Sequence, residues 1–318
     1  MDQTYFQKGF GLRSEIRPQL HENYRSQVVD VMRANGFRLE AGGLTFMLAI
    51  EFGFCYGVER AVEYAYETIT KFPNQRIFLT GEIIHNPHVN NKLKRMGIGF
   101  LPDGPGKYDT VSQDDVVLIP AFGIPAAEID ILAGKSCVIV DTTCGSVLNV
   151  WKNVERYARA GVTSIIHGKS EHEETEATFS RTTLFPGAHY LVVRDRNETA
   201  FVCDYIEKRG DRAEFLGRFQ KAISRGFDPE VHLERIGLAN QTTMLSSESL
   251  QIAEMLRAVR TRRHGPEEMA TRGWLSETAQ TIGITAGAST PNNQIGESIE
   301  RILSFRGTMD LATIIGAH

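Results

Sequence analysis

Residues 136–160 read SCVIVDTTCGSVLNVWKNVERYARA, and this stretch decides the fold class. It begins with a short run of β-branched residues and continues through the small and polar residues 141–146. The apolar residues that follow are spaced three or four apart, which places them on one face of a helix. They are Val147, Val150, Trp151, Val154, Tyr157 and Ala158. The stretch therefore predicts a buried strand, a turn and an amphipathic helix.

The same order of strand, turn and helix recurs along most of the chain. A helical stripe over residues 58–69 follows LTFMLAIEF, and Pro87 and Pro125 stand where two further helices are expected to begin. The other predicted strands lie in RIFLTG, DVVLIPAFG, GVTSIIHGK, AHYLVVRD, ERIGLANQTT and TIGITAGAST. Strands that alternate with helices predict parallel sheets of the α/β class. The stretch 262–280 interrupts this pattern.

The composition excludes several classes of protein. The chain has 318 residues, 42% of them hydrophobic and 23% charged, with a net charge of −4. This charge does not favour nucleic acid or an acidic membrane surface as a partner. We also find no apolar run of the ~20 residues that span a bilayer and no apolar signal segment. We therefore expect a soluble cytoplasmic protein without a nucleic-acid or membrane partner.

Reactive side chains gather where the predicted strands end. In open α/β sheets, ligands bind beyond the carboxyl ends of the strands, so these side chains are candidates for one shared site. They are Cys55, His85, Phe122, Cys144, His167, His172, Glu173, Glu174, Asn240, Gln241, Thr242, Thr243, Ser289 and Thr290.

The four cysteines have different expected roles. In a reducing compartment they favour free thiols or a metal or cluster site over disulfides. Cys55 and Cys144 each stand at a predicted strand-to-helix turn, where a helix N-terminus stabilises a thiolate, although a small buried hydrophobe is an equal alternative for either one alone. Cys137 opens a strand, about 20 Å from Cys144 at ~3.3 Å per residue. Cys203 falls on the apolar stripe of a predicted helix and is expected in the core.

The histidines and carboxylates leave two kinds of chemistry open. His172 and Glu174 could together supply an anion contact and a proton donor. The same residue types with His85 would also suit a zinc hydrolase with His85, His172 and Glu174 as ligands. The segments NQTTM and AGAST offer hydroxyls and backbone amides near helix N-termini, where phosphate groups bind.

Seven ordered motifs resemble one family, the 4-hydroxy-3-methylbut-2-enyl diphosphate reductases, also called IspH or LytB. They are GFCYGVERAV, GEIIHNP, VVLIPAFG, VDTTCGSV, SIIHGKSEHEETEAT, NQTTM and GITAGASTP. The similarity extends from about residue 8 to 305 and is closest to the longer plant and cyanobacterial branch, which also accounts for Phe122 where many members have histidine.

The resemblance implies a role for each matching residue. Cys55 and Cys144 would be thiolate ligands of a [4Fe-4S] cluster, and Glu174 would be the catalytic proton source. The residues implied in binding the substrate diphosphate or hydroxyl are His85, His172, Thr242, Thr243 and Ser289. The implied reaction is reductive dehydroxylation to isopentenyl and dimethylallyl diphosphate, with a ferredoxin or flavodoxin as electron donor.

The chain departs from the family pattern between NQTTM and GITAGAST. A third cluster cysteine and a Ser-Ser-Asn segment should stand there, and neither is present. Three explanations are open: a decayed, non-catalytic diphosphate-binding homologue, a variant whose third ligand comes from Cys203 or a partner chain, or an internally deleted gene. A three-thiolate site that has lost a ligand is expected to be labile, which favours impaired function.

The family also implies three small parallel-sheet α/β modules around a central cleft. We expect a helical N-terminal extension over residues 1–42 and a first module over 43–110 plus 281–318. The second module is expected over 111–195 and an abbreviated third over 196–280.

Overall fold

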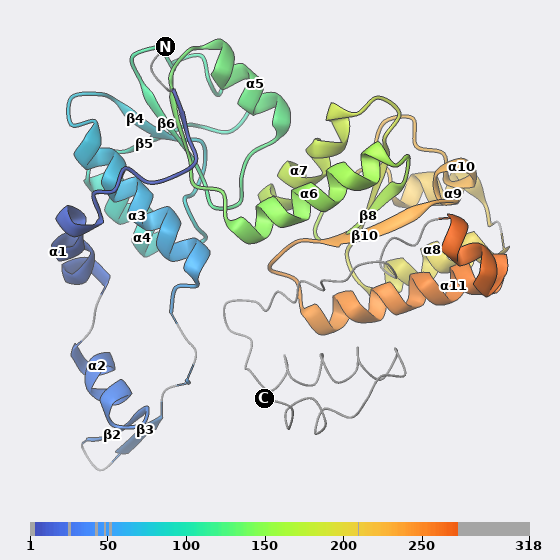
Figure 1. The fold of residues 1–318 in the computed structure, drawn as a ribbon, viewed down its shortest axis with the longest axis horizontal. Helices are drawn as coiled ribbons and strands as arrows, with labels where there is room; N and C mark the ends of the chain where they lie inside the picture. Colours follow the sequence, from blue (N-terminus) through green and yellow to red (C-terminus); the bar gives the residue numbers. More distant parts are fainter. Residues whose placement is uncertain are drawn as a thin grey trace.

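The computed structural model describes residues 4–24, 27–41, 44–47, 49–50, 53–208 and 210–272. Two parallel sheets organise this part of the chain and lie beside each other in Figure 1. The predicted α/β class is therefore confirmed.

The first sheet has the strand order β1-β7-β6-β4-β5, and every neighbouring pair is parallel. The strands are β1 (Tyr5–Phe6), β4 (Ile77–Leu79), β5 (Gly99–Phe100), β6 (Val116–Ile119) and β7 (Val138–Asp141). The helices of this module are α1 (Arg13–Tyr24), α3 (Tyr56–Lys71), α4 (Pro87–Arg95) and α5 (Ala126–Gly134).

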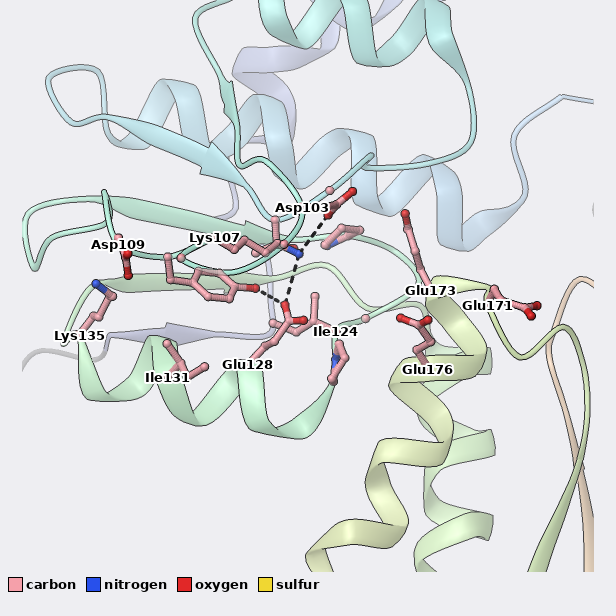
Figure 2. Close-up of a pocket in the computed structure, with 18 residues that line it drawn as sticks. Asp103, Lys107, Asp109, Ile124, Glu128, Ile131, Lys135, Glu171, Glu173 and Glu176 are labelled. Atoms are coloured by element: carbon pink, nitrogen blue, oxygen red, sulfur yellow. Dashed lines mark hydrogen bonds and ion pairs between the residues drawn. The ribbon is translucent and has the colours of Figure 1, made fainter. Parts of the chain in front are cut away.

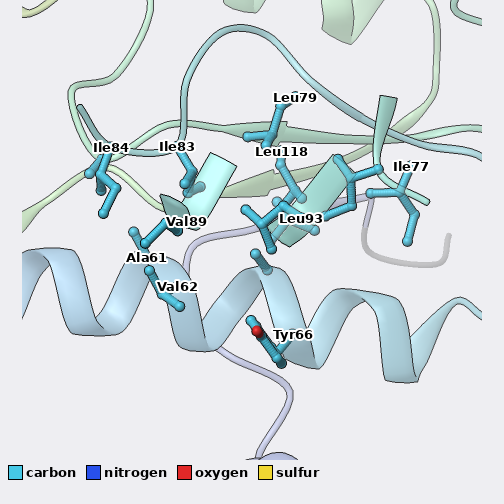
Figure 3. Close-up of a cluster of buried hydrophobic side chains, with 14 of the residues drawn as sticks. Ala61, Val62, Tyr66, Ile77, Leu79, Ile83, Ile84, Val89, Leu93 and Leu118 are labelled. Atoms are coloured by element: carbon cyan, nitrogen blue, oxygen red, sulfur yellow. The ribbon is translucent and has the colours of Figure 1, made fainter. Parts of the chain in front are cut away.

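Strand β6 shows why this sheet is buried on both faces. Its four residues are all apolar and buried, and they point alternately to opposite faces. Val116 and Leu118 join the core formed with α1, α3 and α4, shown in Figure 3, whereas Val117 and Ile119 join the core formed with α5. A continuous apolar run is what a central strand of a parallel sheet requires.

The second sheet has the order β10-β8-β9, again with parallel pairing. Its strands are β8 (Thr163–His167), β9 (Tyr190–Val193) and β10 (Ile236–Asn240). The helical segments of this module are α6 (Gly145–Arg159), α7 (Glu173–Ser180), η1 (Arg181–Leu184), α8 (Arg196–Lys208), α9 (Arg212–Arg218), α10 (Pro229–His232) and α11 (Ser246–Arg272). One face packs against α8, α9 and α11, and the other against α6.

The two modules are linked by a direct chain connection and by a hydrogen bond between their helices. Helix α6 follows directly on β7 of the first sheet but packs on the second. The backbone N–H of Ala126, at the start of α5, donates to Ser180 Oγ at the end of α7 at 2.9 Å. These links hold the carboxyl ends of the two sheets near each other.

The observed pairing corrects the predicted module boundaries. Because β4 pairs directly with β6, the boundary expected after residue 110 falls inside one sheet. Because β10 pairs with β8, the strand at residues 236–240 lies in the second sheet, although it was expected in the third module. The predicted strand and helix at 281–318 lie outside the described residues.

The N-terminal segment also differs from prediction. Strand β1 pairs with β7, so the segment over 1–42 is partly built into the first sheet. The run LTFMLAIEF was expected to form a strand of that sheet, but β3 (Leu44–Met47) pairs antiparallel with β2 (Arg38–Ala41). With α2 (Gln27–Ala34), this hairpin extends away from the modules in Figure 1.

Two adjacent residues of α5 provide a test of the first core. Leu132 is fully buried, whereas its neighbour Ile131 is 47% exposed. We expect Leu132→Ala to lower the free energy of unfolding by about 2–5 kcal/mol, because it removes buried methyl groups and leaves a cavity. Ile131→Ala, the matched control in the same helix, should change it by less than about 1 kcal/mol. Urea denaturation followed by circular dichroism measures both, and equal losses would contradict the assigned core.

Candidate active site

Cys55 and Cys144 occupy the same position at the start of their helices. Each is the N-cap residue of its helix, Cys55 of α3 and Cys144 of α6, and neither side chain caps its helix by a hydrogen bond. A Cβ at Gly57, in the first turn of α3, would overlap Cys144 Sγ. Glycine at this position therefore lets the Cys144 thiol lie against the helix end that carries Cys55.

The other two cysteines are buried in the hydrophobic cores. Cys137 packs with Leu132 and Ile139, and Cys203 packs in the core of the second module. Burial raises the pKa of both thiols, that of Cys203 to about 12. A thiol with a raised pKa is a poor metal ligand, so Cys203 is unsuited as a third cluster ligand in this fold. All four thiols are free.

His85 and His172 meet although they come from different sheets. His85 follows β4, and His172 is the N-cap of α7, which follows β8. Their Nε2 atoms lie 3.2 Å apart. The Phe122 ring, which follows β6, stacks on His85 at a centroid distance of 4.2 Å and contacts His172 edge-on. The aromatic ring thus holds both imidazoles at the junction of the two modules.

Glu174 is a buried carboxyl group held by a single residue of the neighbouring turn. The backbone N–H of Thr242 donates to Glu174 Oε1, and the Thr242 hydroxyl donates to Oε2 at 2.9 Å. Burial raises the pKa of Glu174, while both hydrogen bonds from Thr242 act to lower it. A carboxyl group of raised pKa that is kept away from water suits a proton donor.

Gln241 is a buried residue that the sequence analysis placed among the strand-end candidates without giving it a role. Its Oε1 accepts from the Thr175 hydroxyl at 3.0 Å and from the Lys169 N–H at 3.1 Å. Its Nε2 donates to Thr243 Oγ1 at 2.5 Å. The amide therefore ties the turn after β10 to the loop after β8 and to α7. Its position between Asn240 and Thr242 was visible in the sequence, but its partners were not.

Three other predicted residues have different outcomes. Thr243 is exposed, and its hydroxyl accepts a hydrogen bond from Gln241. His167 lies in the interior, where its Nδ1 is 2.8 Å from Ser249 Oγ at the start of α11. Its role is therefore to anchor that helix. Ser289 lies outside the described residues.

The zinc arrangement proposed from residue types is wrong. In the part of the chain that the structure describes, no group of three or more His, Cys, Asp or Glu side chains is placed to hold a metal ion. Both carboxyl oxygens of Glu174 are instead occupied by Thr242.

A cavity lined by residues of both modules lies beside this site and has different chemistry. It has a volume of about 660 Å³. Figure 2 shows several carboxylates around it, including Asp103, Glu128, Glu173 and Glu176. Lys107 lies 3.7 Å from Asp103 and 3.4 Å from Glu128, so its charge is already paired. The surplus of negative charge makes this cavity unsuited to a diphosphate.

Comparison with known proteins supplies the family. The model of the family described as LytB protein matches residues 46–268. The chain belongs to the LytB family. A 4-hydroxy-3-methylbut-2-enyl diphosphate reductase of Gloeothece citriformis is 46% identical over 269 residues, covering 84% of this chain and 66% of that protein. The chain spans slightly less than two thirds of the length of several curated relatives it matches.

A second relative shows how the chain differs in length. The Microcystis aeruginosa protein of the same name is 47% identical over 390 aligned positions, covering 96% of both chains. Since this chain has 318 residues, at least 72 of those positions have no counterpart in it. The alignment covers 96% of both proteins, so the positions without a counterpart lie inside the aligned region.

A solved structure supports the fold. The chain superposes on the E-1-hydroxy-2-methyl-but-2-enyl-4-diphosphate reductase from Plasmodium falciparum with a TM-score of 0.50 and 22% sequence identity. The match covers 65% of this chain and 54% of that one. Among the described helices, none is both long and apolar enough to cross a membrane.

Glu174 makes a testable contribution to the pH dependence of stability. Because its pKa is raised in the folded state, the folded protein retains a proton that the unfolded chain releases near pH 4.5. Its stabilising contribution is thus complete below about pH 4.5 and is lost as the pH rises through the folded-state pKa. Glu174→Gln keeps an acceptor for the Thr242 N–H but cannot ionise.

We therefore expect the wild-type free energy of unfolding to fall relative to that of Glu174→Gln as the pH rises from 4.5 to 8. Denaturant titrations at several pH values measure the difference. A constant difference between the two proteins would show that the pKa of Glu174 is not raised.

Proposed function

We propose that the chain carries the site of a 4-hydroxy-3-methylbut-2-enyl diphosphate reductase with an impaired capacity to hold its cluster. The observation that supports this is that six side chains from the two modules meet in pairs. Cys144 reaches the helix end of Cys55, His85 meets His172, and Glu174 is held by Thr242. These are the residues to which the family motifs assign ligand, substrate and proton-donor roles.

The residues present fit part of the cluster's ligand set. Cys55 and Cys144 are partly accessible thiols at the N-termini of α3 and α6, and Cys144 Sγ lies against the first turn of α3. The remaining cysteines are buried, so the chain has two suitable thiols. When bound, a [4Fe-4S] cluster would supply electrons, one at a time, and a Lewis-acidic iron.

The other site residues position the substrate and supply the proton. His85 and His172 face each other with ring nitrogens that can donate to phosphate oxygens. Glu174 is the group suited to protonate the allylic hydroxyl so that it leaves as water. The Thr242 N–H and hydroxyl orient the carboxyl group, and they stabilise the carboxylate once the proton has left. A ferredoxin or flavodoxin is the expected electron donor, and the cytoplasm the expected location.

A non-catalytic diphosphate-binding homologue is the second candidate. The observation that favours it is the internal loss of at least 72 positions relative to the Microcystis aeruginosa protein, in a chain without a third accessible thiol. This candidate predicts diphosphate binding through the same histidines, without a stable cluster.

Cysteine variants test the assignment of ligands. After anaerobic reconstitution with iron and sulfide, we expect the wild-type chain to bind iron and to lose it within minutes in air, because one thiolate is missing. Cys55→Ser and Cys144→Ser should each bind less than about a tenth of the wild-type iron, since a single thiolate would remain. Cys203→Ala, the control, should bind as much iron as the wild type. Iron and sulfide analysis with absorbance spectra measures this.

The outcomes separate the two candidates. A wild-type chain that retains no iron after reconstitution would exclude the reductase activity and favour the non-catalytic homologue. Equal iron in Cys203→Ala and Cys144→Ser would exclude the ligand assignment.

Restoring the lost segment tests the cause of the impairment. We expect a chimera carrying the corresponding segment of the Microcystis aeruginosa protein between Arg272 and Gly283 to bind four irons stably. We also expect turnover at least about a hundredfold above that of the wild-type chain, because a complete ligand set keeps the cluster in place. A same-length Gly/Ser insertion is the control. A chimera as labile as the wild type would show that the missing segment is not the cause.

A further inference from the structure

A series of hydrogen bonds connects helix α7 with Glu82. This residue lies in the GEIIHNP motif, but the resemblance gave it no role. The backbone N–H of Glu174 donates to His172 Nδ1 at 3.2 Å. His172 Nε2 lies 3.2 Å from His85 Nε2, and His85 Nδ1 lies 3.4 Å from Glu82 Oε2. These hydrogen bonds thus lead from the buried start of α7 to the Glu82 carboxylate, which is 47% exposed.

The chemistry of the two ends determines where each proton lies. A backbone amide can only donate, so His172 Nδ1 is an acceptor and the neutral ring carries its proton on Nε2. That proton is donated to His85 Nε2, so neutral His85 carries its proton on Nδ1. This second proton points to Glu82, and an ionised carboxylate can only accept. Each ring therefore has one defined tautomer.

The surroundings decide which imidazole can accept a further proton. Burial lowers the pKa of His172, and His85 and Lys169 add to this effect. A proton on His172 Nδ1 would also break its bond from the Glu174 amide. His85 is 46% exposed and has the Glu82 carboxylate beside it.

Charge and stacking also favour a proton on His85. Glu173 and Glu174, from the start of α7, also lie near His85, but burial raises the pKa of both, so the Glu82 carboxylate is the main charged partner. The uncharged Phe122 ring stacks on it, and an aromatic face stabilises a neighbouring cation. His85 thus has a carboxylate within hydrogen-bonding distance and an aromatic ring stacked on it, whereas a proton on His172 Nδ1 would break an existing bond.

We propose that a diphosphate binds between His85 and His172 together with one proton, which His85 Nε2 takes up, and that Glu82 is the positioning residue for this step. In the free site the His85 and His172 Nε2 atoms share one hydrogen. On binding, the His172 N–H turns from His85 to one oxygen of the anion. His85 Nε2 gains a proton from solvent, and this N–H donates a hydrogen bond to a second oxygen of the anion. No covalent bond to carbon or phosphorus changes. The inference rests on the diphosphate contacts assigned under the proposed function.

Nuclear magnetic resonance of the free chain tests the tautomers. Long-range ¹H–¹⁵N spectra of the histidine rings should show His172 protonated at Nε2 and His85 protonated at Nδ1. A free site with His172 protonated at Nδ1 would overturn the proposal. This measurement needs neither cluster nor substrate.

Calorimetry with inorganic pyrophosphate tests the proton uptake. Titrations at one pH in buffers of different ionisation enthalpy report the protons taken up per pyrophosphate bound. We expect the wild-type chain to take up about one proton more than His85→Asn. Glu82→Gln should reduce this excess by at least half and weaken binding about tenfold, because the imidazolium loses its carboxylate partner. Glu22→Gln, the control on the exposed side of α1, makes the same change of net charge and should behave like the wild type.

The outcomes distinguish this inference from the proposed function. Pyrophosphate bound with equal proton uptake in wild type and Glu82→Gln would overturn the inference alone. No pyrophosphate binding would overturn both the inference and the diphosphate contacts, while iron binding by Cys55 and Cys144 would remain to be judged by its own measurement. A purely structural role for Glu82 would change stability without changing proton uptake.

Discussion

The parallel register between β8 and β10 is the constraint on which the site depends. Asn240 pairs with His167, so the chain leaves both strands at the same edge of the sheet. The Gln241 N–H then donates to the carbonyl of His167 at 2.8 Å, which continues the ladder by one residue. Thr242 consequently emerges beside the start of α7, within hydrogen-bonding distance of Glu174. A shift of this register by one residue would turn the Thr242 side chain to the other face.

The first sheet imposes an equivalent constraint on the other half of the site. Strands β4, β6 and β7 are neighbours and parallel, so the residues that follow them share one edge. His85, Phe122 and Cys144 follow these three strands in turn. The Cys144 N–H donates to the carbonyl of Ala121 at 2.9 Å, which holds the turns after β6 and β7 together. The aromatic stack at the junction of the modules is thus a consequence of strand order.

Much of this arrangement could be predicted from the sequence, because its signals are local. The spacing of Val147, Trp151 and Val154 predicts α6, and Pro87 predicts the first residue of α4. The reactive residues that follow the predicted strands indicated the candidate site, because the carboxyl ends of parallel strands lie at one edge of the sheet. The module boundaries could not be predicted, because alternation shows how many strands there are but not which strands pair. Strand β6 is equally apolar whether its neighbour is β4 or a strand of another module.

The antiparallel hairpin of β2 and β3 illustrates the same limit at shorter range. The run that begins at Leu44 has the β-branched and aromatic residues typical of any strand, and only its partner β2 decides its direction. The hydrogen-bond chain from Glu82 to Glu174 was hidden for a different reason. It joins residues that are up to 92 positions apart, and its meaning depends on ring nitrogens whose roles only their partners define.

The cores explain how the chain can lose an internal segment and keep most of its site. Among the described residues, helices cover both parallel sheets, and the buried apolar cores are formed by residues up to Val259. The proposed substrate contacts, His85 and His172, and the proposed proton donor Glu174 follow strands of these two sheets, whereas the proposed cluster would need a further thiol. The proposed consequence is a chain that folds and keeps the His85–His172 contact and the Glu174–Thr242 bonds, but whose retention of iron depends on Cys55 and Cys144.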